Sequence, residues 1–231
     1  DLPGQGQTSR AQKGQIDDFN TYHENILEWI KIANEYKIPT FVLGVGLGGL
    51  IILNLLEKTE LPIEGILLFT PMLELKRDYK GRKNKLISNV GKISKDTRFK
   101  VGITPQDLTR NDEIIEETAN DGLMLKKVTY SWYNLINEKM KETMDHIRDI
   151  KPISALIMYG TNDKILETQS INEMKDKLKS KEMYFKVWDG LYHEIHNEPE
   201  RDLVMRYVLS FLNNSVNTMG FIVNEEEIED I

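Results

Sequence analysis

Three places in this 231-residue chain carry residue types that could do nucleophilic or acid–base chemistry. Gly44-Val-Gly-Leu-Gly-Gly49 lies between two apolar runs, while Asp163 and His193 each follow a later apolar run. A carboxylate that orients an imidazole, beside a nucleophile on a tight strand-to-helix turn, can form and hydrolyse an acyl-enzyme. The glycine segment satisfies G-x-S-x-G at every position except that of the serine, where Gly46 stands.

The same glycines also satisfy G-x-G-x-x-G, the pattern of a dinucleotide-binding turn. That interpretation requires an acidic residue at the tip of the next strand, which holds the ribose hydroxyls. The next apolar run ends Leu67-Leu-Phe-Thr-Pro71 and has no carboxylate at its tip. We therefore favour the strand-to-helix turn of a nucleophile and expect no nucleotide or other cofactor.

Apolar runs alternate with amphipathic segments on both sides of this turn. We predict strands near 40–45, 65–70, 154–159 and 183–188, all parallel. A helix is predicted after Asp17 and Asp18, with an apolar face at the 3.6-residue period formed by Phe19, Tyr22, Ile26, Trp29, Ile30 and Ala33. The alternation predicts an α/β fold, a mostly parallel sheet with helices on both faces. The acid and the imidazole would then both stand just past strand ends.

The alternation breaks between 72 and 150, which is lysine-rich at first and has a helical pattern from about Asn111. About eighty residues are too many for a loop, so we expect a helical cap over the carboxyl edge of the sheet. The predicted division is a core of 1–71 and 151–217, a cap of 72–150 and an acidic tail of 218–231. The tail contains Glu225-Glu-Glu-Ile-Glu-Asp230, which we expect to be solvated.

Composition excludes several classes of protein. The net charge of -7 argues against a nucleic-acid-binding surface, and the absence of cysteine excludes disulfides, thiolate metal sites and cysteine nucleophiles. No apolar run reaches the roughly 18 to 20 residues of a membrane span, and no signal peptide is visible. We expect a cytoplasmic protein without a membrane span, which leaves peripheral membrane contact open.

Five segments together resemble the lysophospholipase and monoacylglycerol-lipase branch of the α/β-hydrolase superfamily (serine aminopeptidase S33 type), specifically its bacterial phospholipase-like members. The family pattern D-x-R/P-G-H-G-x-S is similar to Asp1-Leu-Pro-Gly-Gln-Gly-Gln-Thr-Ser9, and G-H-S-M/L-G-G is similar to Gly44–Gly49. The D-P-L segment of the cap resembles Asn120-Asp-Gly-Leu123 with the later Trp132-Tyr133. The last two patterns, G-x-x-D and Y-H-E…N-E, resemble Gly160-Thr-Asn-Asp163 and Tyr192-His-Glu194 with Asn197-Glu198.

The resemblance implies a carboxylic-ester hydrolase of lysophospholipids or monoacylglycerols that works through Ser, Asp and His. Asp163 and His193 match the acid and the base, Gly46 holds the place of the nucleophile, and the backbone N–H of Leu47 is an expected oxyanion donor. No metal is expected: although His196 lies three residues after His193, the triad already explains His193.

Two departures from the family pattern bear on activity. The serine is replaced by Gly46, and the histidine that usually precedes it is replaced by Val45. Family members also begin with upstream strands and an H-G loop that contributes to the oxyanion hole. We therefore expect the natural protein to be longer, since an apolar parallel edge would otherwise lie open.

Glycine adopts the positive φ of such a turn without a Cβ penalty, so its presence fits a natural loss of the serine. Thr70 and Thr161, at neighbouring strand ends, are weak substitutes because neither lies on the turn. Three interpretations stay open: a catalytically silent protein that binds a small apolar or lipid-like ligand beneath the cap, a hydrolase that uses water or another nucleophile, and an interaction protein with a filled pocket.

Overall fold

A computed structural model describes residues 1–8, 13–76 and 96–217 of the chain. The predicted acidic tail, 218–231, lies outside the described residues, as does most of the lysine-rich start of the predicted cap.

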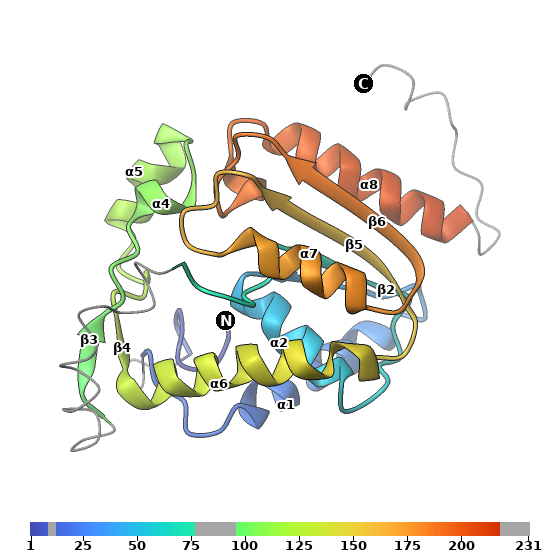
Figure 1. The fold of residues 1–231 in the computed structure, drawn as a ribbon, viewed down its shortest axis with the longest axis horizontal. Helices are drawn as coiled ribbons and strands as arrows, with labels where there is room; N and C mark the ends of the chain where they lie inside the picture. The colour runs from blue at the N-terminus through green and yellow to red at the C-terminus, as the bar shows by residue number, and fades with distance from the viewer. Residues whose placement is uncertain (9–12, 77–95, 218–231) are drawn as a thin grey trace.

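The centre of the fold is a four-stranded parallel sheet with the strand order β1-β2-β5-β6 (Figure 1). Its strands are β1 (Phe41–Val45), β2 (Gly65–Phe69), β5 (Ile153–Gly160) and β6 (Ser180–Trp188). The register aligns Val45 with Phe69 and Phe69 with Met158, so β1 and β2 end level with each other and β5 continues to Gly160. The prediction of four parallel strands is confirmed.

Helices cover both faces of this sheet (Figure 1). They are α1 (Asn20–Asn34), α2 (Leu47–Leu56), α6 (Tyr130–His146) and α7 (Thr168–Lys177) on one face and α8 (Arg201–Asn217) on the other. Alternate side chains of β2 enter the two cores: Ile66 and Leu68 pack with the first group of helices, and Leu67 and Phe69 pack with α8. Because successive side chains of a strand point to opposite faces, a strand between two helical layers must be apolar throughout.

The predicted apolar face of α1 is correct at Tyr22, Ile26 and Ile30, which are buried, and wrong at Trp29. Trp29 is 45% exposed, whereas His23 is buried in its place. Residues 22, 26 and 30 follow one another at a spacing of four, and position 29 lies about 100° around the helix from position 30.

The insertion between β2 and β5 contains more than helices. After β3 (Arg98–Lys100) come α4 (Pro105–Leu108), α5 (Asp112–Asn120), β4 (Lys127–Thr129), α6 and the short 3-10 helix η1 (Ile147–Asp149). β3 and β4 form an antiparallel pair that the sequence did not predict, because three residues are too few for a visible alternation. Ile136 and Met140 of α6 join the same hydrophobic cluster as the sheet. The division into core and cap remains a prediction.

β1 forms one edge of the sheet in the described part of the chain, where it pairs with β2. Leu43 in its middle is 45% exposed. Among the described helices, none is long and apolar enough to cross a membrane.

Candidate functional site

Gly46 forms the tight turn between β1 and α2. Its backbone has φ 50° and ψ −113°, a conformation that favours glycine because it has no Cβ. Two hydrogen bonds to the end of β2 hold the turn: Gly46 N donates to Phe69 O at 3.0 Å, and Met72 N donates to Gly46 O at 2.9 Å. The turn is therefore fixed relative to the neighbouring strand.

Gly44 and Gly49 allow α2 to approach β1 and β2 closely. A Cβ on Gly44 would lie 2.6 Å from Gly49 N, and a Cβ on Gly49 would lie 2.8 Å from Pro71 Cβ. Neither position has room for a side chain without movement of backbone. The glycines of the segment thus meet the packing demands of a strand-to-helix elbow.

Asp163 follows β5 and is completely buried. Its Oδ1 accepts hydrogen bonds from Ile165 N at 2.7 Å and Leu166 N at 2.9 Å, and its Oδ2 lies 2.8 Å from His193 Nδ1. Burial alone would raise the pKa of this carboxyl, but the His193 hydrogen bond and charge and the two backbone donors lower it below its usual value. Asp163 is therefore a carboxylate at neutral pH.

His193 follows β6 and lies with Asp163 and Gly46 at the carboxyl edge of the sheet. Since an ionised Asp163 can only accept, Nδ1 of His193 donates to it, which leaves Nε2 as the ring nitrogen that can accept a proton. A Cβ built on Gly46 would lie 3.2 Å from this Nε2 and 3.8 Å from Cε1. A side chain at position 46 would thus point at the basic nitrogen of the ring.

The hydroxyls of both threonines considered as substitutes are engaged elsewhere. Thr70 is buried, and its Oγ1 donates to the backbone oxygen of His193 at 2.7 Å. Oγ1 of Thr161 donates to Asp189 Oδ1 at 3.1 Å and accepts from Gly190 N at 2.8 Å. Thr70 has a φ of 43°, a strained value for a β-branched residue, so its backbone is held in place by its surroundings. Thr70 supports the histidine loop.

Leu47 is the first residue of α2. The first N–H groups of a helix have no acceptor within the helix and carry a partial positive charge. The N–H of Leu47 follows directly on Gly46, where an oxyanion donor would be required. Its role as a donor remains a prediction.

Glu198 is a buried carboxylate that sequence reasoning quoted as part of a motif but gave no structural role. Its Oε1 accepts a hydrogen bond from Tyr192 N at 2.6 Å, directly before His193. Its Oε2 accepts from Arg110 N at 3.2 Å and from Arg110 Nε at 3.0 Å. Arg110 also pairs with Glu200 at 2.5 Å, but Glu200 is partly exposed. Glu198 therefore joins the histidine loop to the insertion.

Two further hydrogen bonds make the same connection. Glu194 N donates to Leu108 O at 2.8 Å, and Thr109 Oγ1 donates to Asn197 O at 2.9 Å. Residues 108–110 thus hold the loop 192–198 from its outer side. The two segments lie far apart in the sequence, and no periodic pattern connects them. Only the opposite charges of Arg110 and Glu198 could have suggested that the segments are in contact.

The carboxylates near His193 and His196 have other partners. No group of three or more His, Asp or Glu side chains converges as metal ligands within 1–8, 13–76 and 96–217. Glu198 is already bonded to Arg110, and Glu194 Oε2 accepts from Asn197 Nδ2 at 2.7 Å.

The fold and this arrangement of loops define the α/β-hydrolase class. The chain belongs to the family described as serine aminopeptidase S33, whose model matches residues 1–200. It lies among the lysophospholipase- and monoacylglycerol-lipase-like members of that class.

Curated relatives carry names that agree with this family. Phospholipase YtpA of Bacillus subtilis is 30% identical over 217 residues, which cover 94% of this chain and 83% of that protein. Human monoglyceride lipase is 22% identical over 205 residues, which cover 86% of this chain and 66% of the relative. Among solved structures, monoacylglycerol lipase of Paleococcus ferrophilus has a TM-score of 0.80 at 21% identity, with 93% of this chain and 82% of that chain covered.

Proposed function

We propose that this protein descends from an ester hydrolase of lysophospholipids or monoacylglycerols and has lost most of its turnover at Gly46. It retains the site for a small apolar or lipid-like ligand beneath the insertion, together with the acid–base pair Asp163–His193. The lipid substrates named for its relatives motivate this choice of ligand. Its proposed location is the cytoplasm.

The observation that carries the proposal is the direction in which a side chain at position 46 would point. A Cβ there would lie 3.2 Å from His193 Nε2, a tight contact that directs a side chain at this position toward the ring nitrogen, where the base of a serine nucleophile stands. Glycine provides no hydroxyl, so no acyl-enzyme can form at this position. The hydrogen bond between Asp163 and His193 and the positive φ of Gly46 support this interpretation of the site.

A fluorophosphonate probe tests the lost nucleophile directly, because it labels only activated serines. The wild-type protein should stay unlabelled and should hydrolyse p-nitrophenyl esters near background. Gly46→Ser should become labelled and should gain ester turnover, since Oγ would lie beside His193 Nε2 and near the Leu47 N–H. Adding Val45→His would restore the residue that usually precedes the serine.

The matched control is Gly46→Ser combined with His193→Ala, which keeps the hydroxyl but removes its base and should not be labelled. Stoichiometric labelling of the wild-type protein would refute the loss of the nucleophile. If the Gly46→Ser protein folds and neither labels nor turns over ester, position 46 is not a nucleophile position that can be restored.

The runner-up is a non-catalytic binding or interaction protein on the same fold. A third alternative is a hydrolase in which Nε2 of His193 activates a water molecule in place of a serine. The binding protein and this water-activating hydrolase can be told apart by their turnover. Water activation predicts wild-type turnover of monoacylglycerol that His193→Ala abolishes and that the probe does not block. A binding protein shows ligand affinity without turnover, and His193→Ala leaves a background rate unchanged.

A further inference from the structure

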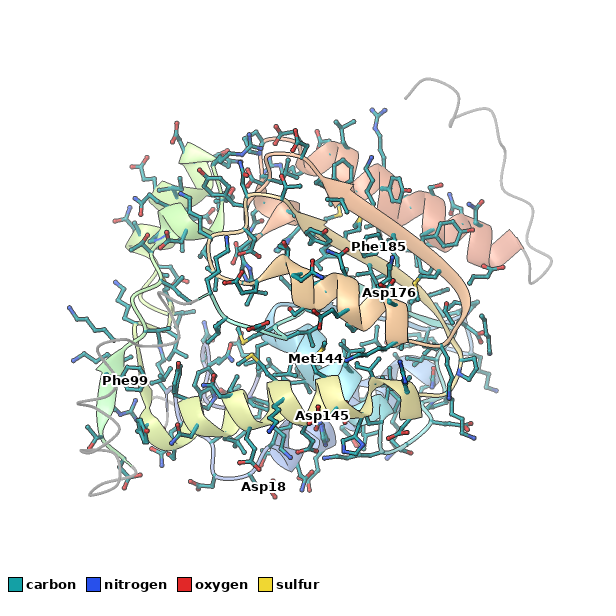
Figure 2. All side chains as sticks on the ribbon, viewed as in Figure 1. Asp18, Phe99, Met144, Asp145, Asp176 and Phe185 are labelled. Atoms are coloured by element: carbon teal, nitrogen blue, oxygen red, sulfur yellow. The ribbon has the colours of Figure 1, made fainter. Side chains whose placement is uncertain are left out.

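The antiparallel pair β3–β4 presents lysines on one side and an aromatic ring on the other. Figure 2 shows Phe99 on β3, and its ring packs edge-to-face on Tyr133 of α6 at a centroid distance of 5.4 Å. Successive strand residues point to opposite faces, so Lys100 points away from the contact that Phe99 makes. The register places Lys127 of β4 directly opposite Lys100. The solvent side of the pair therefore carries two facing ammonium groups.

Nothing within the described part of the chain neutralises this charge. Lys100, Lys126 and Lys127 are exposed, and none of them forms an ion pair with a described acidic residue. Like charges directly opposite in an antiparallel pair destabilise it, by a few tenths to about 1 kcal/mol. An anionic partner would remove that repulsion.

Two of these three lysines border an open groove with a volume of about 390 Å³. Lys100 and Lys126 stand in its lining beside the apolar side chains of Ile103, Pro105 and Met124. Leu123, in the turn before β4, is a further exposed apolar side chain, at 39%. The surface combines cationic groups with apolar ones, as an amphiphile with an anionic head requires.

We propose that this surface, formed by Lys100, Lys126 and Lys127 with the groove beside them, docks onto a membrane that contains anionic lipid. The lysines contact the phosphate headgroups, and Leu123 and the apolar groove lining meet the upper acyl region. The proposed site for lipid-like ligands would then lie close to the membrane that supplies those lipids. The docking does not depend on whether the protein cleaves an ester.

The apolar side chains beside the lysines favour a lipid surface over another polyanion as the partner. A nucleic acid would be bound by phosphate contacts across a broad basic face, whereas this chain has 37 acidic and 30 basic residues. On a chain of net charge -7, a confined basic surface gives contact in one orientation. Lipid headgroups with the interfacial region below them match both components of the surface.

Sedimentation with vesicles tests the proposal without any measurement of catalysis. We expect the protein to bind vesicles of phosphatidylcholine with phosphatidylglycerol, and to bind phosphatidylcholine alone far less. Each lysine near an anionic surface strengthens partition about fivefold, so loss of three lysines should weaken it by about 100-fold, and their reversal to glutamate by at least that much. Salt raised from about 0.05 M to about 0.5 M should release the protein.

The matched control reverses three exposed lysines elsewhere, in Lys31→Glu, Lys179→Glu and Lys181→Glu. It changes the net charge by the same amount and should retain most of the binding. Equal losses in the two triple variants would show that net charge alone matters and would overturn the surface. Absence of binding to anionic vesicles, equal binding to neutral ones, or equal retention of a single-stranded oligonucleotide would overturn the lipid assignment.

Discussion

Arg110 and Glu198 are 88 positions apart, and the Nε of Arg110 lies 3.0 Å from Oε2 of Glu198. The other oxygen of Glu198 accepts the backbone N–H of Tyr192, the residue before His193. The insertion therefore contributes to the placement of the imidazole as well as lying next to it. Glu200, the second partner of Arg110, is partly exposed and provides the natural comparison.

Glu198→Ala should lower the free energy of unfolding by about 3 kcal/mol, because it leaves the Tyr192 N–H and the Arg110 guanidinium without their buried partner. Glu200→Ala should cost less than about 1 kcal/mol, as for an exposed ion pair. Urea denaturation measures both. In proton NMR spectra, the His193 Nδ1–H resonance, shifted downfield by Asp163, should move in Glu198→Ala and stay unchanged in Glu200→Ala. Similar spectra in both variants would restrict Glu198 to a purely structural role.

Asp163 predicts a loss of stability at acid pH. Its pKa is lower in the folded protein than in the unfolded chain, so the unfolded chain binds more protons between the two values. The stability from ionised Asp163 is present above about pH 4 and is lost as the pH falls through the folded-state pKa. Asp163→Asn should flatten this part of the pH profile measured by urea denaturation. Asp176→Asn, which changes an exposed carboxylate, should leave the slope as in wild type.

Two neighbouring glycines should respond to alanine with opposite signs. Gly46→Ala places a Cβ at positive φ and 3.2 Å from His193 Nε2, and should destabilise the protein by about 1 to 3 kcal/mol. Gly48 lies within α2, and a Cβ there would meet nothing within 4 Å. Gly48→Ala should therefore stabilise the protein by up to about 1 kcal/mol, through helix propensity. Thermal unfolding of the pair compares them, and a stabilising Gly46→Ala would contradict the strain.

Glu57 predicts a loss of stability as the pH rises, whereas Asp163 predicts a loss as the pH falls. Burial, the largest cause, raises its pKa to about 7, with Glu142 nearby adding to the effect and Thr143 opposing it. Because the folded state holds this proton more tightly, the stability is complete below about pH 4.5 and is lost as the pH rises through about 7. Glu57→Gln should remove the loss between pH 5 and pH 8. Exposed Glu64→Gln is the control, and an unchanged profile in Glu57→Gln would contradict the shift.

The sheet could be predicted from the sequence because β2 and β5 are buried on both sides. Gly65-Ile-Leu-Leu-Phe69 is apolar at every position, and this follows from two helical layers that each require half of its side chains. Parallel strands also place their carboxyl ends together, which is why the loops of Asp163 and His193 could be expected to meet. The apolar runs and the parallel arrangement that they indicate were therefore enough to predict the sheet and the meeting of these two loops.

The remaining features depend on tertiary contacts that a single sequence does not encode locally. The apolar spacing at the 3.6-residue period predicts Trp29 on the buried face of α1, but position 30 lies at the centre of that face and Trp29 is exposed. The β3–β4 pair is too short to show a period, and its register places two lysines together against ordinary pairing preferences. The contact of Arg110 with Glu198 joins distant segments through charge, for which the sequence offered many other possible partners.

The edge strand β1 has a consequence for handling the protein. One side of it is hydrogen-bonded to β2, and within the described sheet the other side presents free backbone groups beside the exposed Leu43. Such an edge is a template onto which a strand from another molecule can add. We expect the 231-residue chain to self-associate as its concentration rises while its core remains folded. Its recoverable yield should then depend on how often molecules collide, and dilution should preserve it better than cooling.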